Sequence, residues 1–224
     1  NIVPLRELTA PCINNKSTDE FIQWVKAYNK ISNANLTEIS TNYIEKLSGF
    51  KNFKVLEKTE VNREQRTFKI VLKPITKTKI QSGDLMAIYP NKNNIERLYS
   101  IGMIDGNIQL MVKLYEQGLG SNFLYNLSKN DSLKARIINN PTFHFPSKTK
   151  EIAMIANGTG IAPFLGMINQ NKNKLPIKLF VGLRHQDELA MHYQNFAQAQ
   201  INLHKLQSID FAFSRELDKM YVMN

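Results

Sequence analysis

Hydrophobic and polar positions follow two different rhythms along this chain, and the change comes near residue 149. Between about 50 and 146 the apolar segments are short, alternating, rich in Val, Ile, Tyr and Phe, and separated by turns such as QSGD and IDGN. They read FKVLEKTEVN, RTFKIVLKP, DLMAIYP, RLYSIG, IQLMVKLYE and LKARII. Strands of this length and spacing predict a small antiparallel barrel. After QGLGS, the segment SNFLYNLS is expected to form a helix with Ser121 as its N-cap.

From residue 149 onward, apolar runs alternate with helical patterns. EIAMIA is a continuous apolar run of the kind found in a buried parallel strand, NGTGIAP is a glycine turn, and FLGMINQ begins a helix. IKLFVG repeats the strand, DELAMHYQNFAQAQ reads as a second helix, and IDFAFS reads as a third strand. This β-α-β-α-β order predicts an α/β domain with an open parallel sheet and crossover helices.

The first part of the chain has a helical pattern. In STDEFIQWVKAYNKI, Ser17 or Thr18 is a candidate N-cap, and apolar residues follow at helical spacing: Phe21, Trp24, Val25 and Tyr28. We interpret this as an amphipathic helix packed on a neighbour. The predicted boundaries are a helical segment at 1–48, a barrel domain at 49–148 and an α/β domain at 149–224.

Composition narrows the classes of protein. With 224 residues, 42% hydrophobic and 21% charged, the chain can bury one large core or two modest ones, and disorder is not expected. Its apolar runs are far shorter than the ~20 residues that span a bilayer, so we expect no membrane segment. A single cysteine, Cys12, and four scattered histidines predict no internal disulfide and no metal site.

The chain carries 29 basic and 19 acidic residues, a net charge of +10. A nucleic-acid-binding protein is compatible with this charge, but the lysines are dispersed and no nucleic-acid-binding signature is present. A basic surface also suits phosphate-bearing ligands or an acidic protein partner.

Two groups of candidate residues follow strands of the predicted parallel sheet. Gly158, Thr159 and Gly160 follow the first strand, where backbone N–H groups and a helix dipole favour a phosphate; a tight connection without function is the alternative. The second group follows the third strand and comprises Ser214, Arg215, Lys219 and Tyr221. These side chains suit a phosphorylated ribose and a stacked adenine; a solvated loop is the alternative.

A third candidate is the strand RLYS at 97–100. Alternation places Arg97 and Tyr99 on one face and Leu98 and Ser100 on the other. Taken alone, this pattern is equally compatible with an exposed strand of an antiparallel sheet.

The motifs RLYS, GLGSNFL, NPTFHFP, NGTGIAPFLGMI, VGLRHQDE and FAFSRE..KMYV occur in this order. Together they resemble the FAD and NADP(H) domains of the ferredoxin–NADP reductase superfamily, and most of all the diflavin reductases: cytochrome reductase and the flavoprotein subunit of sulfite reductase. The resemblance runs from about residue 50 to the end. It implies an antiparallel β-barrel FAD domain and a three-layer α/β NADP-binding domain whose C-terminal part is missing.

The resemblance also implies roles for the candidate residues. Arg97 would meet the FAD pyrophosphate, Tyr99 would pack on the isoalloxazine ring, and Ser100, the expected catalytic residue, would lie near the ring nitrogen that exchanges hydride. Gly118, Leu119, Gly120 and Ser121 would form a second FAD phosphate loop. Gly158 to Gly160 would face the NADPH pyrophosphate and nicotinamide. The adenosine end would be held by Ser214, Arg215, Lys219 and Tyr221, with Arg184 as a weaker candidate for the same phosphates.

Departures from the family pattern lead to further expectations. Only six residues separate Pro90 from Arg97, so the helical connecting domain of the cytochrome reductases is absent. Asn157 stands where many relatives have proline. NIVPLRELTAPCINN and the helix after it resemble the end of a flavodoxin-like FMN domain, and the family's final strands are expected after Tyr221. We therefore expect this sequence to be a fragment of a longer reductase.

The resemblance predicts a flavoprotein oxidoreductase that transfers hydride from NADPH to FAD, and then single electrons to an FMN domain or another acidic acceptor protein. A noncatalytic FAD-binding electron-transfer module is the alternative, and a basic nucleic-acid-binding protein is a third class. A cytoplasmic location is expected, with the parent protein either free or on the cytoplasmic face of a membrane.

Overall fold

The computed structural model describes residues 26–30, 48–90, 96–146 and 148–222. The chain divides into two compact units, Asn1–Ser48 and Gly49–Asn224. In the first unit, residues 26–30 are helical. The predicted N-caps Ser17 and Thr18, and the apolar positions Phe21, Trp24 and Val25, lie outside the described residues.

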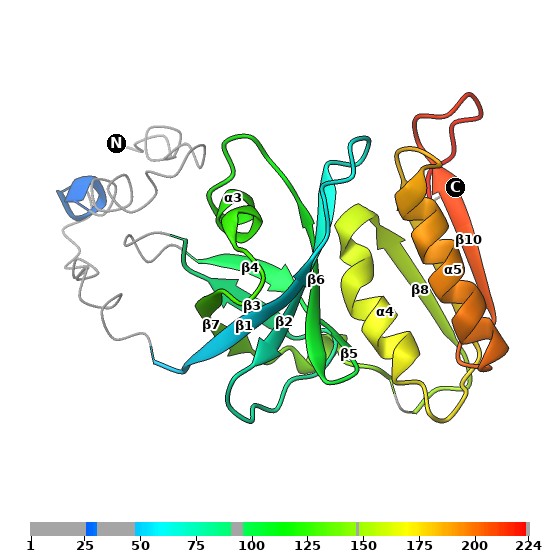
Figure 1. Ribbon diagram of the computed structural model, residues 1–224, viewed down its shortest axis with the longest axis horizontal. Coiled ribbons are helices and arrows are strands. Elements are labelled where there is room, and N and C mark those ends of the chain that lie inside the picture. The colour runs from blue at the N-terminus through cyan, green and yellow to red at the C-terminus, as the bar shows by residue number, and fades with distance from the viewer. Residues whose placement is uncertain (1–25, 31–47, 91–95, 147, 223–224) are drawn as a thin grey trace. The chain divides into compact units, whose positions relative to one another are not determined.

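Seven antiparallel strands form the first sheet of the second unit (Figure 1), in the order β4-β3-β7-β1-β2-β6-β5. They are β1 (Phe50–Lys58), β2 (Thr67–Pro74), β3 (Leu85–Ile88), β4 (Arg97–Ser100), β5 (Gly102–Ile104), β6 (Asn107–Lys113) and β7 (Ser132–Ile138). Inward-facing apolar side chains such as Phe53, Val55, Ile70 and Leu110 are fully buried between the strands.

The two edges of this sheet meet at Ile101. Strands β4 and β5 are at opposite ends of the strand order, yet a single residue separates them in the chain. Ile101 is fully buried, and its backbone N–H donates to the carbonyl of Asp84 at 2.9 Å, which continues the pairing of β4 with the β3 side. The sheet is therefore curled into a nearly closed barrel, as the alternating pattern predicts.

Strand β5 is the one barrel element that the hydrophobic pattern did not predict. The turn after it, however, was predicted, and both of its central residues have positive φ: Asp105 at 51° and Gly106 at 78°. Such a turn matches the twist of two antiparallel strands and joins β5 to β6.

Helix α3 (Leu119–Asn126) follows β6 and begins three residues earlier than predicted. Gly118 is its N-cap, so the prediction of Ser121 as the N-cap is wrong. Ser121 is buried, and its Oγ accepts a hydrogen bond from the Tyr115 N–H at 3.2 Å. Its hydroxyl is used to fix the loop before the helix instead of capping the first turn.

The remainder of the second unit is an α/β layer with a parallel sheet in the order β10-β9-β8. After the short helix η2 (Pro141–Phe143) come β8 (Ile152–Asn157), η3 (Gly158–Ile161), α4 (Ala162–Asn169), β9 (Ile177–Leu183), α5 (Glu188–Asn202) and β10 (Ser208–Phe213). The Asp187 carboxylate caps α5 by accepting from the N–H groups of Leu189 and Ala190. The β-α-β-α-β prediction is thus confirmed.

Both helices pack on one face of this sheet. Buried residues of α4 and α5, such as Leu165 and Tyr193, share a core with Met154 of β8 and Leu179 of β9. Ile155, on the opposite face of β8, is 51% exposed. The expectation that β8 is buried on both faces is therefore wrong within the described residues, where β8 is an edge strand and the two helices form a single layer.

Helix α4 also joins the sheet to the barrel. A Cβ built on Gly102 of β5 would lie 2.1 Å from the carbonyl oxygen of Ala162, and one on Gly166 would lie 2.3 Å from Ser82 Oγ. Helix α4 therefore packs on the barrel so closely that these two positions leave no room for a side chain. Among the described residues, no helix has the length and apolar character that crossing a bilayer requires.

Candidate functional site

A cavity of about 400 Å³ opens where the barrel meets the turn after β8. Four segments line it: strand β4, the end of β6 with the loop after it, the start of α3, and η3. The lining residues are Arg97, Leu98, Tyr99, Ser100, Met111, Lys113, Tyr115, Gly118, Leu119, Gly120, Ser121, Thr159 and Gly160.

The structure brings many of the predicted site residues together in this cavity. All of the predicted FAD residues line it, from both 97–100 and 118–121, and Thr159 and Gly160 of the predicted NADPH turn join them. The predicted residues that do not line it are Gly158, Arg184, Ser214, Arg215, Lys219 and Tyr221.

Arg97 and Tyr99 share one face of β4, as alternation predicts. Gly120 of α3 lies directly against that face: a Cβ built on it would be 2.6 Å from Tyr99 Oη and 2.9 Å from Arg97 Cγ. A side chain at this position would have to displace them, so the start of α3 packs directly against the side chains of β4.

The Tyr99 phenol remains neutral over the physiological pH range. Burial raises the pKa of Tyr99 to about 12, although the neighbouring Arg97 charge opposes this shift. Tyr99 therefore presents an uncharged aromatic ring and a hydroxyl donor to the cavity. Ser100, at the end of the same strand, adds a second neutral hydroxyl.

The cavity has a cationic character. Among the described lining residues the charged ones are Arg97 and Lys113. The first turn of an α-helix also carries backbone N–H groups without intrahelical partners, and α3 begins at the cavity. This combination suits a ligand with an anionic, phosphate-like part and a flat, largely apolar part, so the residues present fit a flavin nucleotide.

A second group of polar residues lies at the carboxyl ends of β9 and β10. The Ser214 N–H donates to the Leu183 carbonyl at 3.0 Å, and the Arg215 N–H donates to the Arg184 carbonyl at 2.9 Å. The loops after the two strands are therefore hydrogen-bonded to each other, as expected for adjacent parallel strands.

Lys113 connects the two groups, although it was not among the residues predicted from the sequence. It lines the cavity, and its pKa is lowered by burial and then by the charges of Arg184, Arg215 and Arg66. These cations are thus close enough to interact. Alternation along β6 could have identified Lys113, because Met111, Lys113 and Tyr115 recur at every second position and all line the cavity.

The turn after β8 contains a backbone conformation that favours glycine. Gly158 has φ of 53°, in the left-handed region. Lys219 is exposed and Tyr221 is 57% exposed. The described contacts do not bring these two side chains to the cavity.

Comparisons with known sequences identify the barrel. The family model of the oxidoreductase FAD-binding domain matches residues 52–141. NADH-cytochrome b5 reductase 1 of Aspergillus terreus is 31% identical over 129 residues, which are 54% of this chain and 44% of that protein. The sulfite reductase [NADPH] flavoprotein alpha-component of Vibrio parahaemolyticus is 32% identical over 168 residues, 66% of this chain and 26% of that protein. The chain thus matches less than half the length of either relative.

Solved structures show the same fold. Ferredoxin-NADP+ reductase from Plasmodium falciparum with 2'P-AMP has a TM-score of 0.64 and 23% identity, over 77% of this chain and 76% of that chain. A ferredoxin NADP+ reductase from Neisseria gonorrhoeae with bound FAD and NADP has a TM-score of 0.61 and 17% identity, over 78% of this chain and 72% of that chain. The resemblance is therefore confirmed: the chain has the two-domain fold of the ferredoxin–NADP reductase superfamily, and its residues 52–141 match the oxidoreductase FAD-binding domain.

Proposed function

We propose that this chain binds FAD in the cavity between β4 and α3 and takes part in transfer of hydride from NADPH to that flavin. Single electrons then pass to an FMN domain or another acidic acceptor protein. The main observation in support is that the cavity joins Arg97, Tyr99 and Ser100 of the barrel to Thr159 and Gly160 of the α/β part. A hydride donor held by the second group would be next to a flavin held by the first.

Each barrel residue has a distinct proposed task. Arg97 and the N–H groups at the start of α3 bind the FAD pyrophosphate. Tyr99 packs on the ring system as a neutral aromatic, and the Ser100 hydroxyl donates a hydrogen bond toward charge that develops on the ring, without itself ionising near neutral pH. When bound, FAD supplies the capacity to accept two electrons together and release them singly.

The basic strand-end residues support the choice of NADPH. Lys113, Arg184 and Arg215 are close enough for their charges to interact, and Ser214 lies on the same loop as Arg215. Such a group binds a phosphate-rich nucleotide better than one with fewer phosphates. Lys219 and Tyr221 complete the proposed adenosine site; the exposed ring of Tyr221 is available for stacking.

NADH is a second candidate donor because relatives such as the Aspergillus terreus protein are NADH-cytochrome b5 reductases. The acceptor is proposed on charge: a chain with a net charge of +10 attracts an acidic partner. The sulfite reductase flavoprotein relative supports a diflavin arrangement, and the cytochrome b5 reductase relatives support a separate protein acceptor.

The test is the visible spectrum of the purified chain under anaerobic conditions, before and after addition of NADPH or NADH. We expect a flavin spectrum that NADPH bleaches faster than NADH. Faster bleaching by NADH would refute the donor preference alone. A yellow protein that neither donor bleaches would favour the noncatalytic module. A colourless protein whose binding to nucleic acid falls steeply with salt would contradict the flavin assignment altogether.

A further inference from the structure

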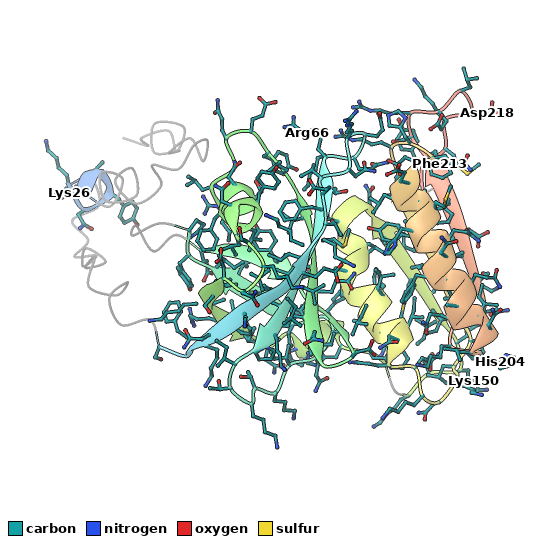
Figure 2. All side chains as sticks on the ribbon, viewed as in Figure 1. Lys26, Arg66, Lys150, His204, Phe213 and Asp218 are labelled. Carbon is teal, nitrogen blue, oxygen red and sulfur yellow. The ribbon has the colours of Figure 1, made fainter. Side chains whose placement is uncertain are left out.

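The hairpin between β1 and β2 reaches the α/β part of the molecule through the side chain of Gln65. Gln65 is only 5% exposed, although its neighbours Glu64 and Arg66 are exposed. Its Nε2 donates to the carbonyl of His185 at 3.2 Å, and its Oε1 accepts from the N–H of Arg184 at 3.3 Å. One amide group thus satisfies two backbone groups in the loop that follows β9. Arg66 and Phe213, labelled in Figure 2, mark the hairpin and the end of the neighbouring strand β10.

The hairpin holds Gln65 in a defined place. The Gln65 N–H donates to Asn62 Oδ1 at 2.7 Å, and the Leu114 N–H donates to the Arg66 carbonyl at 2.7 Å. Arg66 has φ of 53°, an uncommon conformation for a residue with a side chain. The turn is therefore tied both internally and to the end of β6, next to Lys113.

The loop that receives Gln65 is in turn connected to the loop after β10. The Arg184 carbonyl accepts from the Arg215 N–H, and the Gln186 N–H donates to Glu216 Oε1 at 2.9 Å. His185 Nδ1 is 3.4 Å from the same carboxylate oxygen. Arg184 and Arg215 are therefore carried by one hydrogen-bonded unit, and Gln65 attaches this unit to the barrel.

Packing beside this attachment is incomplete. A cavity of about 300 Å³ lies between the hairpin and α5, lined among others by Val61, Phe68, Leu189 and His192. Apolar contacts alone therefore do not hold the hairpin against the α/β part at this point. The Gln65 side chain is buried and its two hydrogen bonds are partly buried, so leaving either partner unpaired has a cost.

The surrounding charges explain why a neutral amide makes these two hydrogen bonds. Burial lowers the pKa of Lys113, and the charges of Arg184, Arg215 and Arg66 lower it further, so each of these arginines repels the Lys113 ammonium group. A carboxylate at position 65 would reduce this repulsion but would also weaken the attraction for phosphate. It could not donate to the His185 carbonyl either. A neutral amide can hold the loop while the positive potential is kept.

We propose that Gln65 is a positioning residue for phosphate recognition: it fixes the backbone of Arg184, and through it Arg215, beside Lys113. This inference rests on the proposed nicotinamide-nucleotide site. It assigns to the barrel hairpin a part in binding the nucleotide of the other domain.

The test uses the 224-residue chain with Gln65→Met, which keeps a similar side-chain length and removes both hydrogen bonds. The probe is adenosine 2′,5′-bisphosphate, titrated by calorimetry, with bound FAD and the hydrogen exchange of residues 183–187 measured on the same samples. We expect binding of the probe to weaken roughly 5- to 10-fold, faster exchange of the Arg184 amide, and unchanged FAD content. Glu64→Gln, on the exposed neighbour, is the matched control and should behave as the unaltered chain.

Gln65→Glu provides a second variant, since it keeps the acceptor for the Arg184 N–H and adds a negative charge. We expect weaker probe binding with Arg184 exchange close to that of the unaltered chain. Unchanged probe binding by Gln65→Met would overturn the positioning role, as would loss of FAD and probe together, which would show a purely structural role. An unaltered chain that does not bind the probe would instead refute the proposed nucleotide site, and the positioning role with it.

Discussion

Arg97 has a particular place in the proposed site because it is a fixed positive charge at the start of a short strand, beside a helix that begins with glycines. Guanidinium groups bind pyrophosphate oxygens through charge-assisted hydrogen bonds that neutral side chains do not replace. The contribution of Arg97 to ligand binding can therefore be measured separately from its contribution to the stability of the fold.

Arg97→Ala is expected to weaken FAD binding by roughly 10- to 100-fold, the equivalent of one lost charged hydrogen-bond partner. Bound FAD after gel filtration, measured by visible absorbance, is the readout. Arg63→Ala, an exposed arginine in the β1–β2 hairpin, is the control. Full retention of FAD in Arg97→Ala would show that the strand is misassigned.

Ser100→Ala should leave FAD bound while slowing its reduction by NADPH roughly 100-fold, the typical effect of removing one donor to developing charge. Stopped-flow bleaching of the flavin spectrum measures this rate, and Ser132→Ala, at an exposed position of β7, is the comparison. An unaltered rate would remove the catalytic role proposed for Ser100.

The lowered pKa of His192 predicts how the free energy of unfolding depends on pH. Its pKa is lowered from 6.5 by burial and then by the Lys69 charge, with Glu57 opposing. Below about pH 6.5 the unfolded chain binds a proton that the folded chain does not, so the free energy of unfolding falls as the pH decreases. His192→Gln should reduce this fall.

The measurement for His192 is urea unfolding at about pH 7.5 and pH 5.5. The comparison is His204→Asn, which removes an exposed histidine at a positive-φ position that asparagine tolerates. Equal pH dependence in His192→Gln and the unaltered chain would contradict the assignment.

At the scale of elements, α3 shows how a helix start can be shaped by a neighbouring strand. Gly120 is in the first turn, where the side chains of Arg97 and Tyr99 occupy the space of a Cβ. The helix can therefore lie this close to β4 without displacing those two side chains only if position 120 is glycine.

Gly120→Ala is expected to displace Arg97 and Tyr99 and to lower stability by about 1–3 kcal/mol, as overpacking does. FAD affinity should fall as well, because both side chains face the cavity. Gly160→Ala is the control for stability, since a Cβ there meets nothing within 4 Å. Thermal unfolding and FAD titration of both variants give the comparison; equal values in the two would argue against close contact of α3 with β4.

The same elements show what the sequence could and could not predict. Period-2 alternation predicted most barrel strands, and it predicted that Arg97 and Tyr99 share a face, because these features depend on local spacing. It did not predict β5, since three residues between Ile101 and a turn are too few to show a period. The helix start at Leu119 was missed because Ser121 satisfies local capping rules, while its hydrogen bond with Tyr115 in the preceding loop decides its role.

Residues that act through contacts between distant parts of the chain were also missed. Gln65 has no unusual sequence context, and only the meeting of the barrel and the α/β part gives its side chain its hydrogen-bond partners. The strand-end group was predicted because parallel strands bring their carboxyl ends to one edge. Its link to the cavity through Lys113 required the whole fold.

For the molecule as a whole, the contact of Gly102 with Ala162 sets how closely β5 and α4 approach. The atom that a Cβ would meet is a backbone carbonyl oxygen at 2.1 Å, so no side-chain movement can make room. A substitution here must move the helix or the strand.

Gly102→Ala should therefore lower the free energy of unfolding by about 1–3 kcal/mol. It should also slow NADPH-driven flavin reduction more than it weakens FAD binding, because α4 follows directly from the turn that contains Thr159 and Gly160. Denaturant unfolding and bleaching rates test this, with Gly160→Ala again as the stability control. A fully stable Gly102→Ala protein would be inconsistent with the packing described.

Closure of the barrel at Ile101 has a consequence for the aggregation of the protein. Strand β4, which carries Arg97 and Tyr99, leads directly into β5 at the other edge of the sheet. Detachment of this segment would therefore expose unpaired backbone N–H and C=O groups at both edges at once. Such margins recruit strands from other molecules. Detachment of this segment would thus lead to self-association of the chain. A ligand that binds to the segment and holds it in the sheet would reduce this aggregation.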